Sequence, residues 1–145
     1  IAAEKVNGDN VSGQVLAIDI LPIDSLAGVT PIQLDIYQDN IIDTIKANLK
    51  KKNADIVLSD MAPSTTGHKD TDHLRIVSLL EHALDISEEL LENGGTFLGK
   101  VFRGGTEKEI LNRMKKNFQI VKHIKPKSSR SDSTELYVIG LNYKK

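Results

Sequence analysis

The sequence predicts an α/β protein whose sheet is mostly parallel and carries one antiparallel edge strand. Short apolar runs alternate with segments in which apolar residues recur at helical spacing, the order expected of layered α/β folds. The last two apolar runs are joined without a helix, and such a connection joins antiparallel strands. Three of the earlier runs lead into an acidic residue, which indicates one ligand-facing edge of the sheet.

The first part of the chain begins with two strands. Residues 14–19 (QVLAID) and residues 31–34 are short apolar runs, which we predict to be buried parallel strands. Residues 39–51 place apolar side chains at helical spacing, and residues 54–59 (ADIVLS) return to strand character. The helix therefore connects two strands in a βαβ pattern.

The second part carries the longest helix and an apolar strand with one cation in it. Apolar residues recur at helical spacing over residues 72–92, and Gly94 and Gly95 are the signal that ends this helix. Residues 96–102 (TFLGKVF) form the strand that contains Lys100. Because the run is apolar on both sides of Lys100, we expect this strand to be central in the sheet.

The chain closes with a helix and two strands. Thr106 and Glu109 have the spacing of a capping box, which predicts a helix to about residue 116. Residues 118–124 and 135–141 show the alternation and the branched side chains of strands. A polar, basic loop over residues 125–134 joins them.

Composition limits the class of protein. With 145 residues, 39% of them hydrophobic, the chain can form one compact domain, which we place at residues 1–145. No apolar run approaches the roughly 20 residues of a membrane span, and no signal sequence opens the chain, so we expect a cytoplasmic protein. The absence of cysteine excludes disulfides and thiolate metal sites, and we expect no metal.

Charge is distributed unevenly along the chain. Residues 1–100 contain 8 Lys and Arg against 16 Asp and Glu, whereas residues 101–145 contain 11 against 4. This asymmetry predicts an acidic part that faces a cofactor and a basic surface that meets phosphate groups. Solvated lysines on exposed helix faces are the alternative interpretation for any single residue.

Asp19, Asp35 and Asp60 each end or follow a predicted strand. In doubly wound sheets, ligands bind beyond the carboxyl ends of the strands. A carboxylate there can accept both hydroxyl groups of a ribose, as we expect for Asp19, or the exocyclic amine of adenine, as we expect for Asp35. Together the three acids predict a ligand that contains adenosine.

Lys100 marks a second candidate site. A cation within an apolar strand emerges into a cleft or pairs with an acid, although a lysine that protects an edge strand is the competing interpretation. Asp60 lies in the run SDMAP, where Pro63 fixes the exit from the strand, and Glu135 opens the last strand. Both carboxylates could reach Lys100 and hold its ammonium group.

These motifs resemble, in order and spacing, those of the FtsJ/RrmJ ribosomal RNA methyltransferases. The resemblance covers about residues 13–143 and rests on SDMAP, GKVF around Lys100, the KPxSSR pattern at residues 125–130, Glu135-Leu136-Tyr137, and the positions of Asp19 and Asp35. It implies a Rossmann-like methyltransferase fold with S-adenosylmethionine as cofactor. It also implies methyl transfer to a ribose 2'-hydroxyl, most simply of a uridine, in the RNA of the large ribosomal subunit.

The family uses a Lys-Asp-Lys-Glu tetrad, and the resemblance maps its last three members onto Asp60, Lys100 and Glu135. The first lysine, the first strand and the glycine-rich cofactor loop have no counterpart in the sequence. We therefore expect a chain that is incomplete at its N-terminus and inactive by itself.

The chemistry of methyl transfer suggests a role for each residue. The 2'-hydroxyl needs help to lose its proton, and Lys100 could take it as a neutral amine or stabilise the developing alkoxide as an ammonium group. The sequence leaves both open, because nearby acids favour the charged form whereas burial favours the neutral one. Asp60 would orient Lys100 near the methionine end of the cofactor, with Asp19 and Asp35 on its adenosine.

The basic loop predicts contacts to RNA. Lys125, Lys127 and Arg130 would contact phosphates, and Ser129 would donate to phosphate or sugar oxygens. Weaker additions to this surface are Arg103, Arg113, Lys115 and Lys116.

Two other functions remain open at the level of sequence. A non-catalytic RNA-binding module, or an inactive methyltransferase remnant, would lack the first lysine and the cofactor loop. A nicotinamide-dependent oxidoreductase would hold the ribose of its cofactor with Asp19, but it would leave Lys100 and Glu135 without a role.

Overall fold

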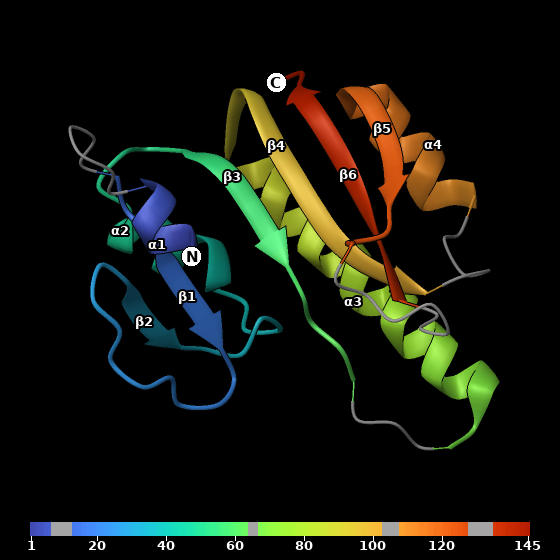
Figure 1. The fold of residues 1–145 in the computed structure, drawn as a ribbon, viewed down its shortest axis with the longest axis horizontal. Coiled ribbons are helices and arrows are strands. Elements are labelled where there is room, and N and C mark those ends of the chain that lie inside the picture. Colours follow the sequence, from blue (N-terminus) through green and yellow to red (C-terminus); the bar gives the residue numbers. More distant parts are fainter. Residues whose placement is uncertain (7–12, 64–66, 103–107, 128–134) are drawn as a thin grey trace. The chain divides into compact units, whose positions relative to one another are not determined.

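The computed structural model describes residues 1–6, 13–63, 67–102, 108–127 and 135–145. These residues form two compact units, Ile1–Asn53 and Ala54–Lys145. Both units combine helices and strands, which confirms the predicted α/β class (Figure 1). Within the described ranges, no helix is long and apolar enough to cross a membrane.

The first unit contains a small parallel sheet. Its elements are α1 (Ala2–Val6), β1 (Leu16–Asp19), β2 (Thr30–Gln33) and α2 (Ile41–Asn48). β1 and β2 pair in parallel as predicted. The prediction that both strands are buried is wrong, since their side chains are half-buried or exposed. A sheet of two strands has too few neighbours of its own to cover both faces.

The second unit is built on a four-stranded sheet. Its elements are β3 (Ala54–Ser59), α3 (Lys69–Leu90), β4 (Leu91–Phe102), α4 (Lys108–Asn117), β5 (Phe118–Ile124) and β6 (Glu135–Tyr143). The strand order is β3-β4-β6-β5, with β3 and β4 parallel and β6 antiparallel to both of its neighbours. β5 is thus an edge strand held by antiparallel pairing, which confirms the predicted antiparallel edge.

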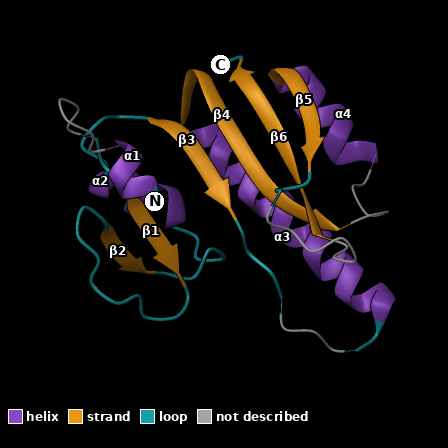
Figure 2. Cartoon of the chain, viewed as in Figure 1, coloured by secondary structure: helices purple, strands orange, loops and turns teal. Residues whose placement is uncertain are grey.

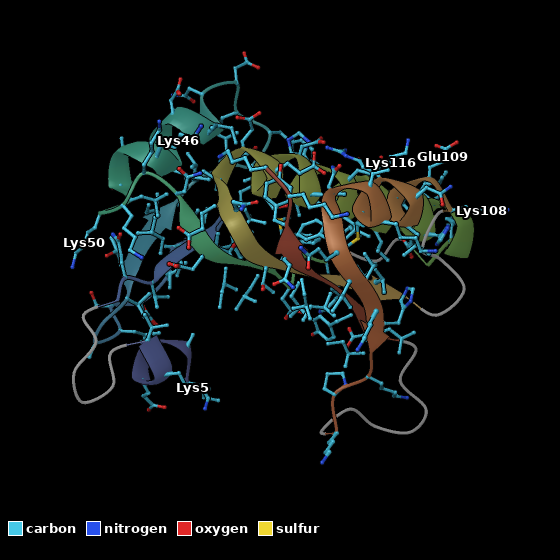
Figure 3. The ribbon with its side chains drawn as sticks, turned by 90° about the horizontal axis from the view of Figure 1, so that it is seen from above. Lys5, Lys46, Lys50, Lys108, Glu109 and Lys116 are labelled. Carbon is cyan, nitrogen blue, oxygen red and sulfur yellow. The ribbon has the colours of Figure 1, made fainter. Side chains whose placement is uncertain are left out.

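Both helices of this unit lie on the same side of the sheet (Figures 2 and 3). The hydrophobic core lies between these helices and the sheet, and it includes the fully buried residues Leu84, Phe97, Met114 and Val138. Successive side chains of a strand point to opposite faces. Because Phe97 faces the helices, Lys100, three residues further along β4, faces the other side of the sheet.

Gly99 allows α3 to pack closely beside this part of β4. A Cβ atom at Gly99 would lie 2.5 Å from the Cδ1 of Leu80 on α3 and 3.0 Å from the ring of Phe97. A side chain at this position would force Leu80, the Phe97 ring or the helix to shift. The glycine next to Lys100 therefore leaves room for the Leu80 side chain against the strand.

The boundary between α3 and β4 differs from the prediction. The helix ends at Leu90, and the strand begins at once with Leu91, which is fully buried and opposite Ala54. Gly94, expected to end the helix, lies within the strand with a φ of 87°. The pairing of β3 with β4 shifts register between Ala54 and Ile56. The positive φ of Gly94 accompanies this irregularity in the strand.

Candidate active site

The carboxyl ends of β3 and β4 bring Asp60 and Lys100 together. Ser59 pairs with Gly99 in parallel register, so the residues that follow them lie side by side. The Nζ of Lys100 is 3.0 Å from the Oδ1 of Asp60. β4 lies between β3 and β6. Lys100 is therefore on a central strand as predicted, and it does not protect an edge.

β6 contributes two more side chains to this cluster. Its antiparallel register places Glu135 opposite Phe102 and Tyr137 opposite Lys100. The Nζ of Lys100 is 3.5 Å from the Oε1 of Glu135, and the hydroxyl of Tyr137 donates a 2.7 Å hydrogen bond to the Oδ1 of Asp60. The predicted residues Asp60, Lys100 and Glu135 therefore meet, with Tyr137 as a fourth member.

The motif Glu135-Leu136-Tyr137 predicts no separate role for Tyr137. A signal for it was present, because Glu135 and Tyr137 are two apart on a strand and so point to the same face. What the sequence did not show is its partner, since Asp60 lies 77 residues away along the chain.

The electrostatics of the cluster favour the charged form of Lys100. Its side chain is only 11% exposed, whereas those of Asp60 and Glu135 are 71% and 44% exposed. Burial acts to lower the pKa of Lys100, but the hydrogen bond and charge of Asp60 and the charge of Glu135 outweigh it and raise that pKa. Burial acts to raise the pKa of Asp60, and the hydrogen bonds from Tyr137 and Lys100 lower it overall.

These pKa shifts predict how Asp60→Asn changes stability with pH. We expect the variant to lower the free energy of unfolding by less than about 1 kcal/mol near neutrality, because Asp60 is largely exposed. The lowered pKa of Asp60 means that its contribution is present above the usual aspartate pKa and is lost as the pH falls through the folded value. The raised pKa of Lys100 means that its contribution is lost only as the pH rises above the usual lysine range.

Urea unfolding of the parent and of Asp60→Asn, from roughly pH 3 to roughly pH 10, checks this prediction. The difference between the two proteins should be constant from the neutral range to the alkaline end and shrink only toward the acid end. Asp24→Asn, at an exposed loop position, is the control. A difference that grows as the pH falls would contradict the assigned ion pair.

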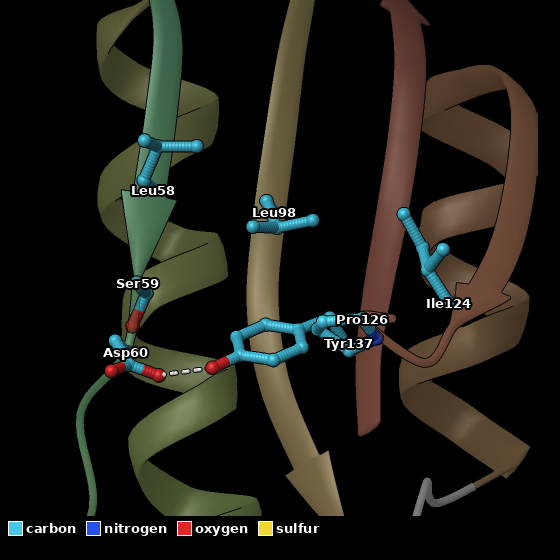
Figure 4. Close-up of a pocket in the computed structure, with 7 residues that line it drawn as sticks. All are labelled: Leu58, Ser59, Asp60, Leu98, Ile124, Pro126 and Tyr137. Carbon is cyan, nitrogen blue, oxygen red and sulfur yellow. Dashed lines mark hydrogen bonds between the residues drawn. The ribbon is translucent and has the colours of Figure 1, made fainter. Parts of the chain in front are cut away.

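A pocket of about 500 Å³ adjoins the cluster on the sheet face that the helices leave open (Figure 4). It is lined by Leu58, Ser59, Asp60, Leu98, Ile124, Pro126 and Tyr137. Most of these side chains are apolar, and the polar ones gather at the end where Asp60 meets Tyr137. In the described part of the chain, no group of three or more His, Asp or Glu residues is placed to hold a metal ion.

Asp19 and Asp35 occupy the carboxyl edge of the small sheet in the first unit. Asp19 ends β1 opposite Gln33, and Asp35 follows β2 by two residues. The Oδ1 of each carboxylate accepts a 2.9 Å hydrogen bond from a backbone N–H two residues on, that of Leu21 or of Tyr37. Each of these hydrogen bonds closes a turn that fixes one carboxylate oxygen of the aspartate. The other oxygen can accept a hydrogen bond from a ligand.

The predicted RNA contacts are described only in part. Lys125 and Lys127 directly follow β5, with Lys125 half-buried and Lys127 exposed. Ser129 and Arg130 lie outside the described residues, as do Arg103 and the expected helix cap Thr106.

Comparison with known proteins identifies relatives along nearly the whole chain. The family model described as FtsJ-like methyltransferase matches residues 1–143. The chain is 50% identical over 132 residues to the ribosomal RNA large subunit methyltransferase E of Parvibaculum lavamentivorans, covering 91% of the chain and 52% of that protein. It is 44% identical to the protein of the same name from Rickettsia akari, covering 97% of the chain and 61% of the relative.

Solved structures share the fold. A candidate ribosomal RNA methyltransferase from Plasmodium falciparum superposes with a TM-score of 0.82 at 29% identity, over 97% of this chain and 76% of that one. A candidate methyltransferase from Streptococcus mutans, in complex with SAH, gives a TM-score of 0.51 at 17% identity, over 89% of this chain and 71% of that one. The chain spans 52% to 61% of the length of its two sequence relatives above.

Proposed function

Because the chain belongs to the FtsJ-like methyltransferase family, we propose that it carries the catalytic residues of an RNA methyltransferase. The methyl donor is S-adenosylmethionine, and the acceptor is a ribose 2'-hydroxyl, most simply of a uridine, in the RNA of the large ribosomal subunit. The observation that carries the proposal is the contact of Lys100 with both Asp60 and Glu135. The names of the sequence relatives support the choice of RNA.

Lys100 acts in this proposal as an ammonium group. S-adenosylmethionine, held by Asp19, Asp35 and Asp60, would supply an electrophilic methyl group to the 2'-oxygen and would leave as S-adenosylhomocysteine. Lys100 donates a hydrogen bond to the 2'-oxygen as negative charge develops there. Asp60 and Glu135 hold the ammonium group in place, and their exposed carboxylates pass the hydroxyl proton to water. The raised pKa of Lys100 supports this form over a neutral amine.

The cofactor would be held by the strand-end acids. The open carboxylate oxygens of Asp19 and Asp35 suit the ribose hydroxyls and the adenine amine, respectively. Asp60, exposed and ionised, suits the positively charged methionine end. The SAH-bound structural relative supports a ligand of this class.

The remaining assignments follow from the same proposal. Both compact units belong to one methyltransferase domain, since the family model spans them. The protein works in the cytoplasm, where ribosomal subunits are assembled, and displacement at a sulfonium requires no metal ion.

Methyl transfer by the natural full-length polypeptide tests the proposal. It would be incubated with labelled S-adenosylmethionine and large-subunit ribosomal RNA, free or in subunits, from cells that lack the modification. We expect a 2'-O-methylated nucleoside in the digested RNA. RNA binding without transfer to either substrate would favour the non-catalytic RNA-binding module.

Lys125→Gln combined with Lys127→Gln is expected to weaken RNA binding about 10-fold at low salt. Each phosphate contact that is lost should also flatten the slope of log affinity against log salt by about 0.7. Filter binding at several salt concentrations measures both quantities, and affinity for S-adenosylmethionine should not change. Lys50→Gln with Lys52→Gln, which removes two exposed lysines ahead of β3, is the matched control. An equal loss in the control would show a response to net charge only.

A further inference from the structure

The outer face of α4 carries positive charge that the proposed site does not use. Residues 108–127 contain 7 Lys and Arg and a single acid, Glu109, in a chain whose net charge is −1. Two of these cations, Lys125 and Lys127, are already assigned to RNA near the catalytic cluster. Most of the others lie on α4, on the side of the sheet opposite Lys100, and they include Lys115 and Lys116, which the sequence predicted as weaker RNA contacts.

α4 has two distinct faces. Ile110 and Met114 are 2% and 0% exposed and pack into the core. Lys108, Lys115 and Lys116 are exposed. Helical spacing places these three lysines, with Asn112 between them, on one side of the helix. Figure 3 shows Lys108 and Lys116 projecting from α4 away from the sheet, together with Glu109.

The inward cation of the same helix shows a different arrangement. Arg113 donates two hydrogen bonds to Glu88, of 3.1 and 2.7 Å, and forms a 2.6 Å ion pair with Asp85. Asn117 donates a 2.8 Å hydrogen bond to Glu88 as well. Arg113, which the sequence had suggested as a weak RNA contact, thus joins α4 to α3 and has its charge matched within the protein.

The outward lysines of α4 differ from Arg113 in their charge partners. No ion pair joins Lys108, Lys115 or Lys116 to an acid in the part of the chain that the structure describes. They extend over nine residues of helix, or about 12 Å along its axis. That length is sufficient to meet more than one phosphate of a nucleic-acid backbone.

We propose that this α4 lysine face, defined by Lys108, Lys115 and Lys116, is a second contact surface for the RNA backbone, separate from the catalytic cluster. The inference rests on the proposed function, which makes RNA the partner of the same protein. A protein partner fits less well, because no aromatic or aliphatic side chain of α4 is exposed within the described residues, and protein interfaces depend on such anchors. Lysines on flexible stems suit phosphates that are contacted without regard to sequence.

The test is a triple variant of the full-length polypeptide, Lys108→Gln with Lys115→Gln and Lys116→Gln. The probe is unmodified large-subunit ribosomal RNA, with binding measured at several salt concentrations. We expect affinity to fall at least 10-fold at low salt and the salt slope to flatten by about 1.5 to 2.5, near 0.7 to 0.9 for each phosphate contact. The kcat at saturating RNA and the affinity for S-adenosylmethionine should equal those of the parent.

Two further variants complete the test. Lys50→Gln with Lys51→Gln and Lys52→Gln removes the same charge elsewhere and should change binding much less. Replacement of the three α4 lysines by arginine should keep the parental affinity and slope. Glutamine retains good helix propensity, so melting temperatures should agree among the variants.

Parental affinity and slope in the glutamine triple, or an equal loss in the control triple, would overturn the α4 proposal. Failure of the proposed function is a separate result. It would show as absence of methyl transfer by the parent, whereas the binding series would still report on the α4 lysine face.

Discussion

Lys100→Ala is expected to lower the kcat of methyl transfer by about 10³-fold, the range spanned by proton-transfer and alkoxide-stabilising groups. The ammonium group is 11% exposed and contacts Asp60 and Glu135, so no solvent molecule can take its place with the same charge and position. The substitution removes a side chain on the open face of the sheet and leaves the helix-facing core unchanged. Affinity for S-adenosylmethionine should therefore change little.

Three variants distinguish charge, position and fold in this experiment. Lys100→Met keeps the length of the side chain without its charge and should be as inactive as Lys100→Ala. Lys100→Arg keeps the charge in a planar group that does not match the same contacts, and we expect it to recover only a small part of the rate. Lys122→Ala, at an exposed lysine of β5 in the same sheet, should keep full activity.

Single-turnover rates with prebound RNA, together with circular dichroism of each variant, give the comparison. A folded Lys100→Ala protein with a rate within 10-fold of the parent would show that the cluster is not catalytic. The function would then have to be sought in RNA binding.

The contact between Asp60 and Lys100 was predictable because each residue stands at the carboxyl end of a continuous apolar run, or within one. Such runs identify strands from local sequence, and parallel strands place their carboxyl ends at one edge of a sheet. The apolar residues on both sides of Lys100 also indicated a central strand, which the pairing of β4 with β3 and β6 confirms. Only local information was needed for these conclusions.

Features that depend on pairing between distant segments were not predictable. The hydrogen bond from Tyr137 to Asp60 requires the register between β4 and β6, which the composition of either strand does not determine. The engagement of Arg113 by Asp85 and Glu88 likewise depends on how α3 packs against α4. For the same reason the sequence did not distinguish the exposed Lys115 from the ion-paired Arg113 on the same helix.

Phe118→Ala is expected to lower the free energy of unfolding by about 3 to 5 kcal/mol, the largest stability effect that we predict. Phe118 is 1% exposed, and its ring centroid lies 5.2 Å from that of Tyr143 and 6.5 Å from that of Phe97. Removal of the ring leaves a cavity where β5, β6 and the helices meet. Phe118→Leu should cost less than about 1.5 kcal/mol, and urea unfolding of the three proteins measures the difference.

Gly140 makes the packing of this ring testable in a second way. A Cβ atom at Gly140 would lie 2.7 Å from the Cγ of Phe118, so Gly140→Ala should destabilise the parent by about 1 to 3 kcal/mol. In the Phe118→Ala background the added methyl group meets no ring, and the two substitutions should together cost less than the sum of their separate effects. Simple additivity would mean that the ring does not rest on Gly140. Because β6 also carries Glu135 and Tyr137, this contact links the core to the register of the proposed catalytic cluster, so Gly140→Ala should also lower kcat while Phe118→Leu should not.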